Sequence, residues 1–106
     1  MTTFDKREEG FEAKFAHDEE LRFLAVARRN KRIGAWAAGL MGLSEAQAAA
    51  YAAQLAAPDL IASEERLALK VVADLKAKGI DRSAQEVLST MKGLLAQAIA
   101  DIEAGR

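Results

Sequence analysis

The chain has 106 residues, which fits one small domain, and its 51% hydrophobic and 29% charged residues are typical of a globular protein. A net charge of −1 argues against a nucleic-acid-binding protein, and the complete lack of cysteine excludes disulfides, thiolate catalysis and zinc–thiolate sites. The first residues of the chain contain no apolar segment of the kind that a secretory signal requires. No apolar run approaches the ~20 residues of a membrane span, so we expect a cytoplasmic protein without membrane insertion.

The N-terminal segment differs in charge from the neighbouring segment of the chain. Residues 1–20 carry seven acids and three bases, a balance of 3 − 7 = −4, whereas residues 21–43 carry five bases and no acid. Such asymmetry is typical of an arm that meets a partner.

Three phenylalanines, Phe4, Phe11 and Phe15, are spaced seven and four residues apart in this segment, which would give one apolar stripe on a helix. Gly10 lies between them and weakens an isolated helix by about 1 kcal/mol relative to alanine. We therefore expect residues 1–19 to form a mobile arm that becomes helical in a partner's groove. The spacing is equally compatible with an arm that folds back and caps the core of its own bundle.

Residues 18–41 are predicted to form a long helix that ends at Gly42, a plausible C-cap glycine. Its apolar residues recur at steps close to three and four, as helical core positions do. They are Leu21, Leu24, Ile33, Trp36, Ala37 and Leu40.

An alanine-rich helix is predicted next, from the capping box of Ser44 and Gln47 to the residue before Pro58. Tyr51 and Leu55 are its only bulky apolar residues, so we expect a neighbouring helix to approach it closely.

A third helix is predicted to begin near Asp59 or Ser63 and to end at Gly79, and a fourth begins with the capping box of Ser83 and Glu86. The third helix has a stripe of Leu67, Val71 and Leu75, and the apolar positions of the fourth are Val87, Leu88, Met91, Leu94, Leu95, Ala98, Ile99 and Ile102. Short connections make neighbouring helices antiparallel, so the sequence predicts an all-α, four-helix antiparallel bundle over residues 20–104.

Few residues suggest a catalytic or metal-binding site. His17 and Glu20 make one H-x-x-E pair, but further metal ligands are missing and a packing role is the simpler interpretation. The basic run at 27–32 is most simply a solvated helix face, with pairing to the acidic arm or to a partner as an alternative. No nucleophile constellation or acid–base pair stands out, so we expect no enzyme, no cofactor and no metal site.

Residues 4–42 closely resemble the start of the zeta subunit of alphaproteobacterial F-type ATP synthase, a small inhibitor of ATP hydrolysis. The elements that match are Phe4, Arg7-Glu8, Phe15-Ala16-His17-Asp18, Glu20-Leu21, Phe23, Ala27-Arg28-Arg29-Asn30, Gly34 and Trp36-Ala37-Ala38. The rest of the chain matches more loosely, in length, in helix count and in the run "KVVADL" at 70–75.

The resemblance implies a four-helix bundle whose arm inserts as a helix at a catalytic α/β interface of the ATPase head, near the γ stalk. Rotation would then be blocked in the hydrolytic direction only. Carried onto this chain, the arm contacts would be Phe4, Arg7, Glu8, Phe11, Lys14 and Phe15, with Arg28 and Arg29 as a secondary contact. The partners would be the α, β and γ subunits, and the bound protein would be peripheral to the inner membrane. The alternative is a generic helical adaptor that binds another protein through its arm and basic first helix.

Overall fold

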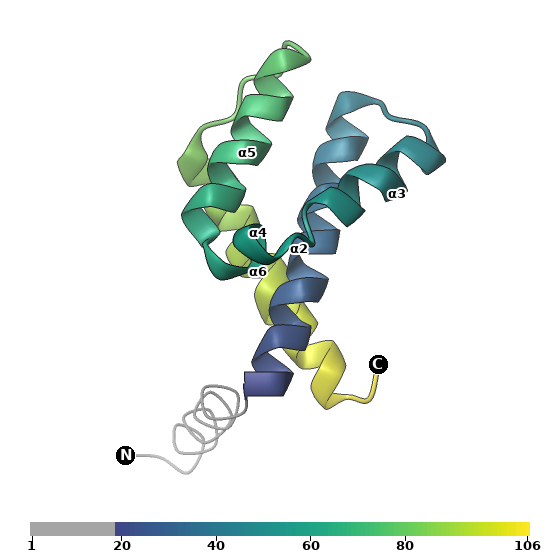
Figure 1. The fold of residues 1–106 in the computed structure, drawn as a ribbon, viewed down its shortest axis with the longest axis vertical. Coiled ribbons are helices and arrows are strands. Elements are labelled where there is room, and N and C mark those ends of the chain that lie inside the picture. Colours follow the sequence, from purple (N-terminus) through teal and green to yellow (C-terminus); the bar gives the residue numbers. More distant parts are fainter. Residues whose placement is uncertain (1–18) are drawn as a thin grey trace.

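The computed structural model describes residues 19–106, and every regular element in this range is a helix (Figure 1). The helices are α2 (Glu19–Met41), α3 (Glu45–Gln54), α4 (Pro58–Ala62), α5 (Glu64–Ala77) and α6 (Ala84–Glu103). The predicted all-α fold class is therefore confirmed.

Local signals at the helix ends behave as predicted. Ser44 and Ser83 each form a full capping box, in which the serine hydroxyl accepts from the backbone N–H three residues on and the Gln47 or Glu86 side chain accepts from the serine N–H. Gly42 and Gly79 have φ angles of +68° and +78°, which only glycine adopts without strain. These contacts span at most a few residues, so the sequence contains all the information that specifies them.

The segment around Pro58 differs from the prediction. The alanine-rich helix ends at Gln54 instead of Ala57, and a separate five-residue helix, α4, begins at Pro58. Proline cannot continue a helix because it lacks the N–H, but its fixed φ suits the first turn of a new one. Ser63 then caps α5, accepting from the N–H of Arg66 at 3.2 Å. Residues 19–106 thus contain five helices, four long and one short, where four were predicted.

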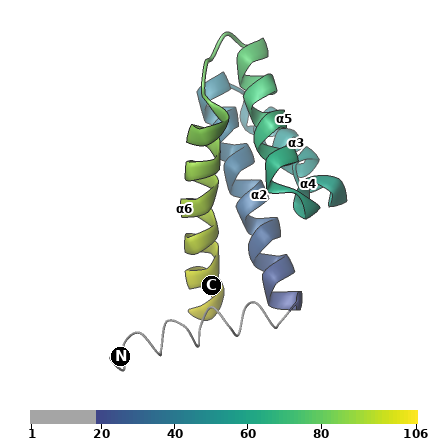
Figure 2. The ribbon, with the colours of Figure 1, turned by 90° about the vertical axis from the view of Figure 1, so that its left-hand side faces the viewer.

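Helix α2 is central, because it packs against each of the other four described helices. Helix α6 runs antiparallel to both α2 and α5, as Figure 2 shows. Helix α3 lies against α2 at Gly34, where an added Cβ would lie only 2.8 Å from the Cα of Ala52. The close approach expected of the alanine-rich helix is therefore present.

The core lies between these helices and includes Leu67, Val71 and Leu75, whose predicted stripe on α5 is fully buried. Leu24 was predicted to be a core residue and is instead 43% exposed, while its neighbour Ala25 is buried. Periodicity alone could not distinguish them, because it does not show which side of α2 the other described helices cover (Figures 1 and 2). Trp36 packs against the core but stays partly exposed.

Helix α6 buries only part of its apolar face. Val87, Met91 and Ala98 are buried, whereas Leu95, Ile99 and Ile102 are half-buried.

Candidate partner-binding surface

The predicted arm contacts lie outside the described residues: Phe4, Arg7, Glu8, Lys14, Phe11 and Phe15. The same holds for His17, and hence for its pairing with Glu20. Within residues 19–106, no group of three or more His, Cys, Asp or Glu side chains could hold a metal ion.

The part of α2 that directly follows the arm exposes large apolar side chains. Phe23 is 56% exposed and Leu24 is 43% exposed. Only one other large apolar residue in the described range, Leu69 on α5, is as open to solvent. Two of three such residues within the first two turns of α2 make this region a candidate interaction surface.

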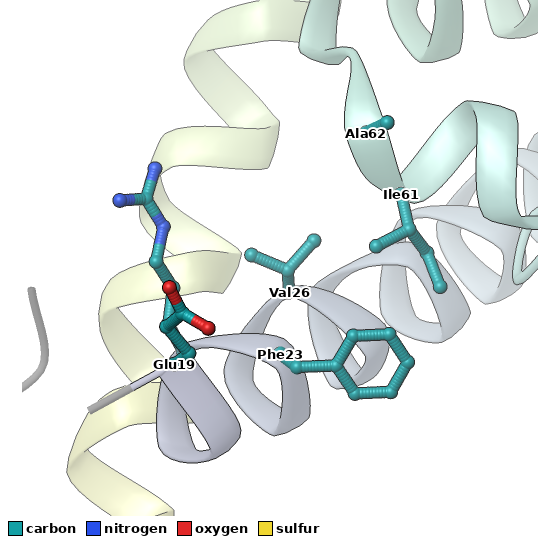
Figure 3. Close-up of a pocket in the computed structure, with 6 residues that line it drawn as sticks. Glu19, Phe23, Val26, Ile61 and Ala62 are labelled. Atoms are coloured by element: carbon teal, nitrogen blue, oxygen red, sulfur yellow. The ribbon is translucent and has the colours of Figure 1, made fainter.

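Phe23 also forms one wall of a groove between α2 and α4, with a volume of about 370 Å³. Glu19, Arg22, Phe23 and Val26 line it from α2, and Ile61 and Ala62 line it from α4. In Figure 3 the side chains of Phe23 and Val26 lie toward Ile61, while Glu19 lies farther from it along α2. We refer to these six residues as the α2–α4 groove.

Arg29, predicted with Arg28 as a secondary partner contact, is inside the molecule. It is 1% exposed, its Nη1 donates to Glu64 Oε1 at 3.1 Å and its Nε donates to Asn30 Oδ1 at 3.1 Å. Burial lowers the pKa of Arg29, and the charge and hydrogen bond of Glu64 oppose that shift. This guanidinium therefore joins α2 to the start of α5, and its surface role is corrected to a structural one. Arg28 is half-buried, and its role as a contact stays a prediction.

Asn30 continues this buried polar network. It is fully buried, and its Nδ2 donates to the backbone carbonyl of Leu55, the C-cap residue of α3, at 2.8 Å. The bond satisfies a carbonyl at a helix end that would otherwise lack a partner. Arg29 and Asn30 thus connect α2 to α5 and α3.

A spacing in the sequence could have identified Arg29 as buried. Ala25, Arg29, Ile33 and Ala37 follow one another at intervals of four, and all four are buried. Residues four apart share a helix face, so an arginine between apolar positions signals a buried, paired cation.

The family model of ATPase inhibitor subunit zeta matches residues 1–101, nearly the whole chain. This chain belongs to the ATPase inhibitor subunit zeta family. No curated protein and no solved structure gives a significant match. The family supports a role as a regulator that binds an ATPase and inhibits it. Between Glu19 and Arg106, no helix has both the length and the apolar character that crossing a bilayer requires.

Some of the residues by which this chain resembles its family are buried and others are exposed. Arg29, Asn30 and Gly34 serve the packing of α2 against α3 and α5. Phe23, in contrast, is exposed and adjoins the arm. Arg29, Asn30 and Gly34 therefore serve the fold, whereas Phe23 is open to solvent.

Further polar contacts join α2 to α6 and α3 to α5. Arg32 Nη2 donates to Asp101 Oδ2 at 2.6 Å, joining α2 to α6, and this bond holds the pKa of Asp101 below its usual range. Tyr51 of α3 donates its hydroxyl proton to Asp74 Oδ2 on α5 at 2.8 Å, and Lys70 Nζ donates to the same oxygen at 3.1 Å. The Arg32–Asp101 and Tyr51–Asp74 contacts bridge helices at partly exposed sites, whereas Lys70 and Asp74 both lie on α5.

Proposed function

We propose that this protein inhibits ATP hydrolysis by an F-type ATP synthase. Its arm, residues 1–19, inserts as a helix at a catalytic α/β interface close to the γ stalk. Insertion blocks rotation in the hydrolytic direction, and rotation in the synthetic direction expels the arm. The observation that carries the proposal is the match to the ATPase inhibitor subunit zeta family over residues 1–101, a range that includes the arm.

In this proposal the arm and the helical domain have separate roles. Phe4, Phe11 and Phe15 enter an apolar groove of the ATPase, where each contributes roughly 1.5–3 kcal/mol if fully desolvated. Arg7, Glu8 and Lys14 make the polar contacts at its rim, and Arg28 is a secondary contact. The helices from α2 to α6 hold the arm at the interface, and the protein is cytoplasmic except when bound to the enzyme at the inner membrane.

Support for an interaction at this end of the molecule comes from α2. Its first two turns expose Phe23 and Leu24, which follow the phenylalanines of the arm in the sequence. The arm is acidic and α2 basic, and these charges would affect the rate at which the arm meets a partner.

The test is ATP hydrolysis by the purified ATPase head in the presence of increasing inhibitor. The variant carries Phe4→Ala, Phe11→Ala and Phe15→Ala, and the matched control is Leu69→Ala, which alters an exposed apolar residue on α5. We expect the triple variant to need at least roughly tenfold more protein for half-inhibition, and the control to match the native chain. Equal inhibition by the triple variant and the native chain would disprove arm insertion.

Capture of partners distinguishes the inhibitor from a generic adaptor. With MgATP turning over, the native chain should co-purify with the α, β and γ subunits. Recovery of an unrelated protein in place of these subunits would favour the adaptor.

A further inference from the structure

The α2–α4 groove is large enough to take an aromatic side chain. A cavity of about 150 Å³ accommodates a benzene ring, and the groove offers about 370 Å³. Its apolar walls are Phe23 and Val26 on α2 and Ile61 on α4. Phe23 remains 56% exposed, so the described helices do not complete the burial of its ring.

The chain itself supplies a suitable occupant. Eighteen residues precede Glu19, they contain three phenylalanines, and they join the described structure at a residue that lines the groove. Along α2, Glu19 and Val26 are about 10 Å apart at 1.5 Å per residue. Phe11 lies eight residues before Glu19, and an extended chain of that length spans at most about 27 Å. Phe11 can therefore reach the groove and leave several residues for the necessary reversal of direction.

Charge favours the same occupant. Residues 1–18 carry five acids and three bases, a balance of 3 − 5 = −2, whereas residues 19–43 carry five bases and two acids, a balance of 5 − 2 = +3. Arg22 lies at the groove and is exposed, so it can attract the acidic arm, while Glu19 at the arm end opposes this attraction. The net attraction should weaken as salt is added.

We propose that the α2–α4 groove binds the chain's own N-terminal segment in the free protein, with the Phe11 ring between Phe23, Val26 and Ile61. The groove is thus an intramolecular docking site that keeps the arm from its partner.

Docking of this kind regulates inhibition, a consequence that rests on the proposed function. An arm held in the groove cannot enter the ATPase, so the rate of inhibition scales with the fraction of molecules whose arm is free. If three quarters of the arms are docked, release of all of them accelerates the onset about fourfold.

Disulfide formation in the full chain tests the docking directly, because the native sequence has no cysteine. One variant combines Glu12→Cys with Ala62→Cys in the groove, and the matched variant combines Glu12→Cys with Leu24→Cys on the exposed side of α2. Residue 24 is closer along the chain to the arm, so an undocked arm should meet it at least as often. We expect the disulfide to residue 62 to form at least threefold faster, and added Phe11→Ala to abolish that preference.

Two results would overturn the docking proposal. The first is a disulfide to residue 24 that forms as fast as the disulfide to residue 62, or faster. The second is a disulfide to residue 62 that joins two chains and not one, which would assign the groove to a second copy.

An inhibition assay separates this proposal from the proposed function. Ile61→Glu places in the groove wall a charge of the same sign as the acidic arm, and Leu69→Glu is the matched exposed control on α5. We expect Ile61→Glu to accelerate the onset of ATPase inhibition about fourfold and the control to leave it unchanged. An unchanged onset with Ile61→Glu, while the native chain inhibits, overturns the docking. Failure of every variant and of the native chain to inhibit overturns the proposed function, and the disulfide rates then still decide where the arm binds.

Discussion

A methyl group at Gly34 tests the close approach of α2 and α3 on which the helical domain depends. The Cβ of Gly34→Ala would lie 2.8 Å from the Cα of Ala52 and 3.2 Å from both the Cβ of Ala52 and Cδ1 of Leu55. The nearest of these atoms belongs to the backbone of α3, so relief of the contact requires the helix itself to move. Overpacking of this kind costs about 1–3 kcal/mol.

Gly39→Ala is the matched control, because Gly39 also lies inside α2 but an added Cβ there meets nothing within 4 Å. Both substitutions gain about 1 kcal/mol of helix propensity, so their difference isolates the steric contact. We expect Gly39→Ala to raise the free energy of unfolding, and Gly34→Ala to lie about 1–3 kcal/mol below it. Urea titrations followed by the fluorescence of Trp36, the only tryptophan, measure both. Equal stabilisation by the two substitutions would refute the close packing of α3 on α2.

Three further predictions concern charge and the arm. Glu64→Gln removes the charge that faces buried Arg29, and we expect it to lower the free energy of unfolding in a urea titration by about 1 kcal/mol, since Glu64 is 62% exposed and water screens the pair. Burial and the hydrogen bond to Asp74 raise the pKa of Tyr51, so the folded state keeps the phenol neutral and its stability should fall as pH rises above about 10, where the unfolded chain ionises. Tyr51 is the only tyrosine, so the ultraviolet absorbance of tyrosinate reports its titration, and Asp74→Asn should shift that titration to lower pH. Gly10→Ala should strengthen the bound arm helix by about 1 kcal/mol, which an ATPase titration would show as an about fivefold lower concentration for half-inhibition.

The elements that the sequence predicts well depend on neighbours in the chain. The capping boxes at Ser44 and Ser83 and the C-cap glycines Gly42 and Gly79 involve residues within one helical turn, and the structure contains all four. The buried stripe of α5 could likewise be predicted, because Leu67, Val71 and Leu75 are four residues apart and therefore lie on one face of the helix. Local chemistry and a single periodicity suffice for such features.

The features that the sequence predicts poorly depend on residues far apart in the chain. The spacing of Arg29 can indicate its burial but not its partner, because Glu64, which accepts its hydrogen bond, lies 35 residues away. Leu24 is exposed because none of the helices between Glu19 and Arg106 covers its side of α2, which the periodicity of α2 cannot reveal. The α2–α4 groove exists because Pro58 starts a separate short helix beside α2. No sequence pattern within α2 or α4 predicts that these two helices are in contact.

Part of the candidate site could be predicted from the sequence, and part is visible only in the structure. Resemblance to the family named the arm contacts, and the family model matches residues 1–101, a range that includes them. The structure adds the exposed Phe23 and the groove beside it, and it moves Arg29 from the surface to the interior. The arm contacts themselves stay predictions.

The most direct test of the central claim compares ATP hydrolysis and ATP synthesis by the same coupled membranes, with the native chain and with a chain that lacks residues 1–17. Circular dichroism of the shortened chain first confirms that it is helical. The account predicts that the native chain slows hydrolysis and spares synthesis, and that the shortened chain affects neither. Full inhibition of hydrolysis by the shortened chain, or equal inhibition of both directions by the native chain, would contradict it.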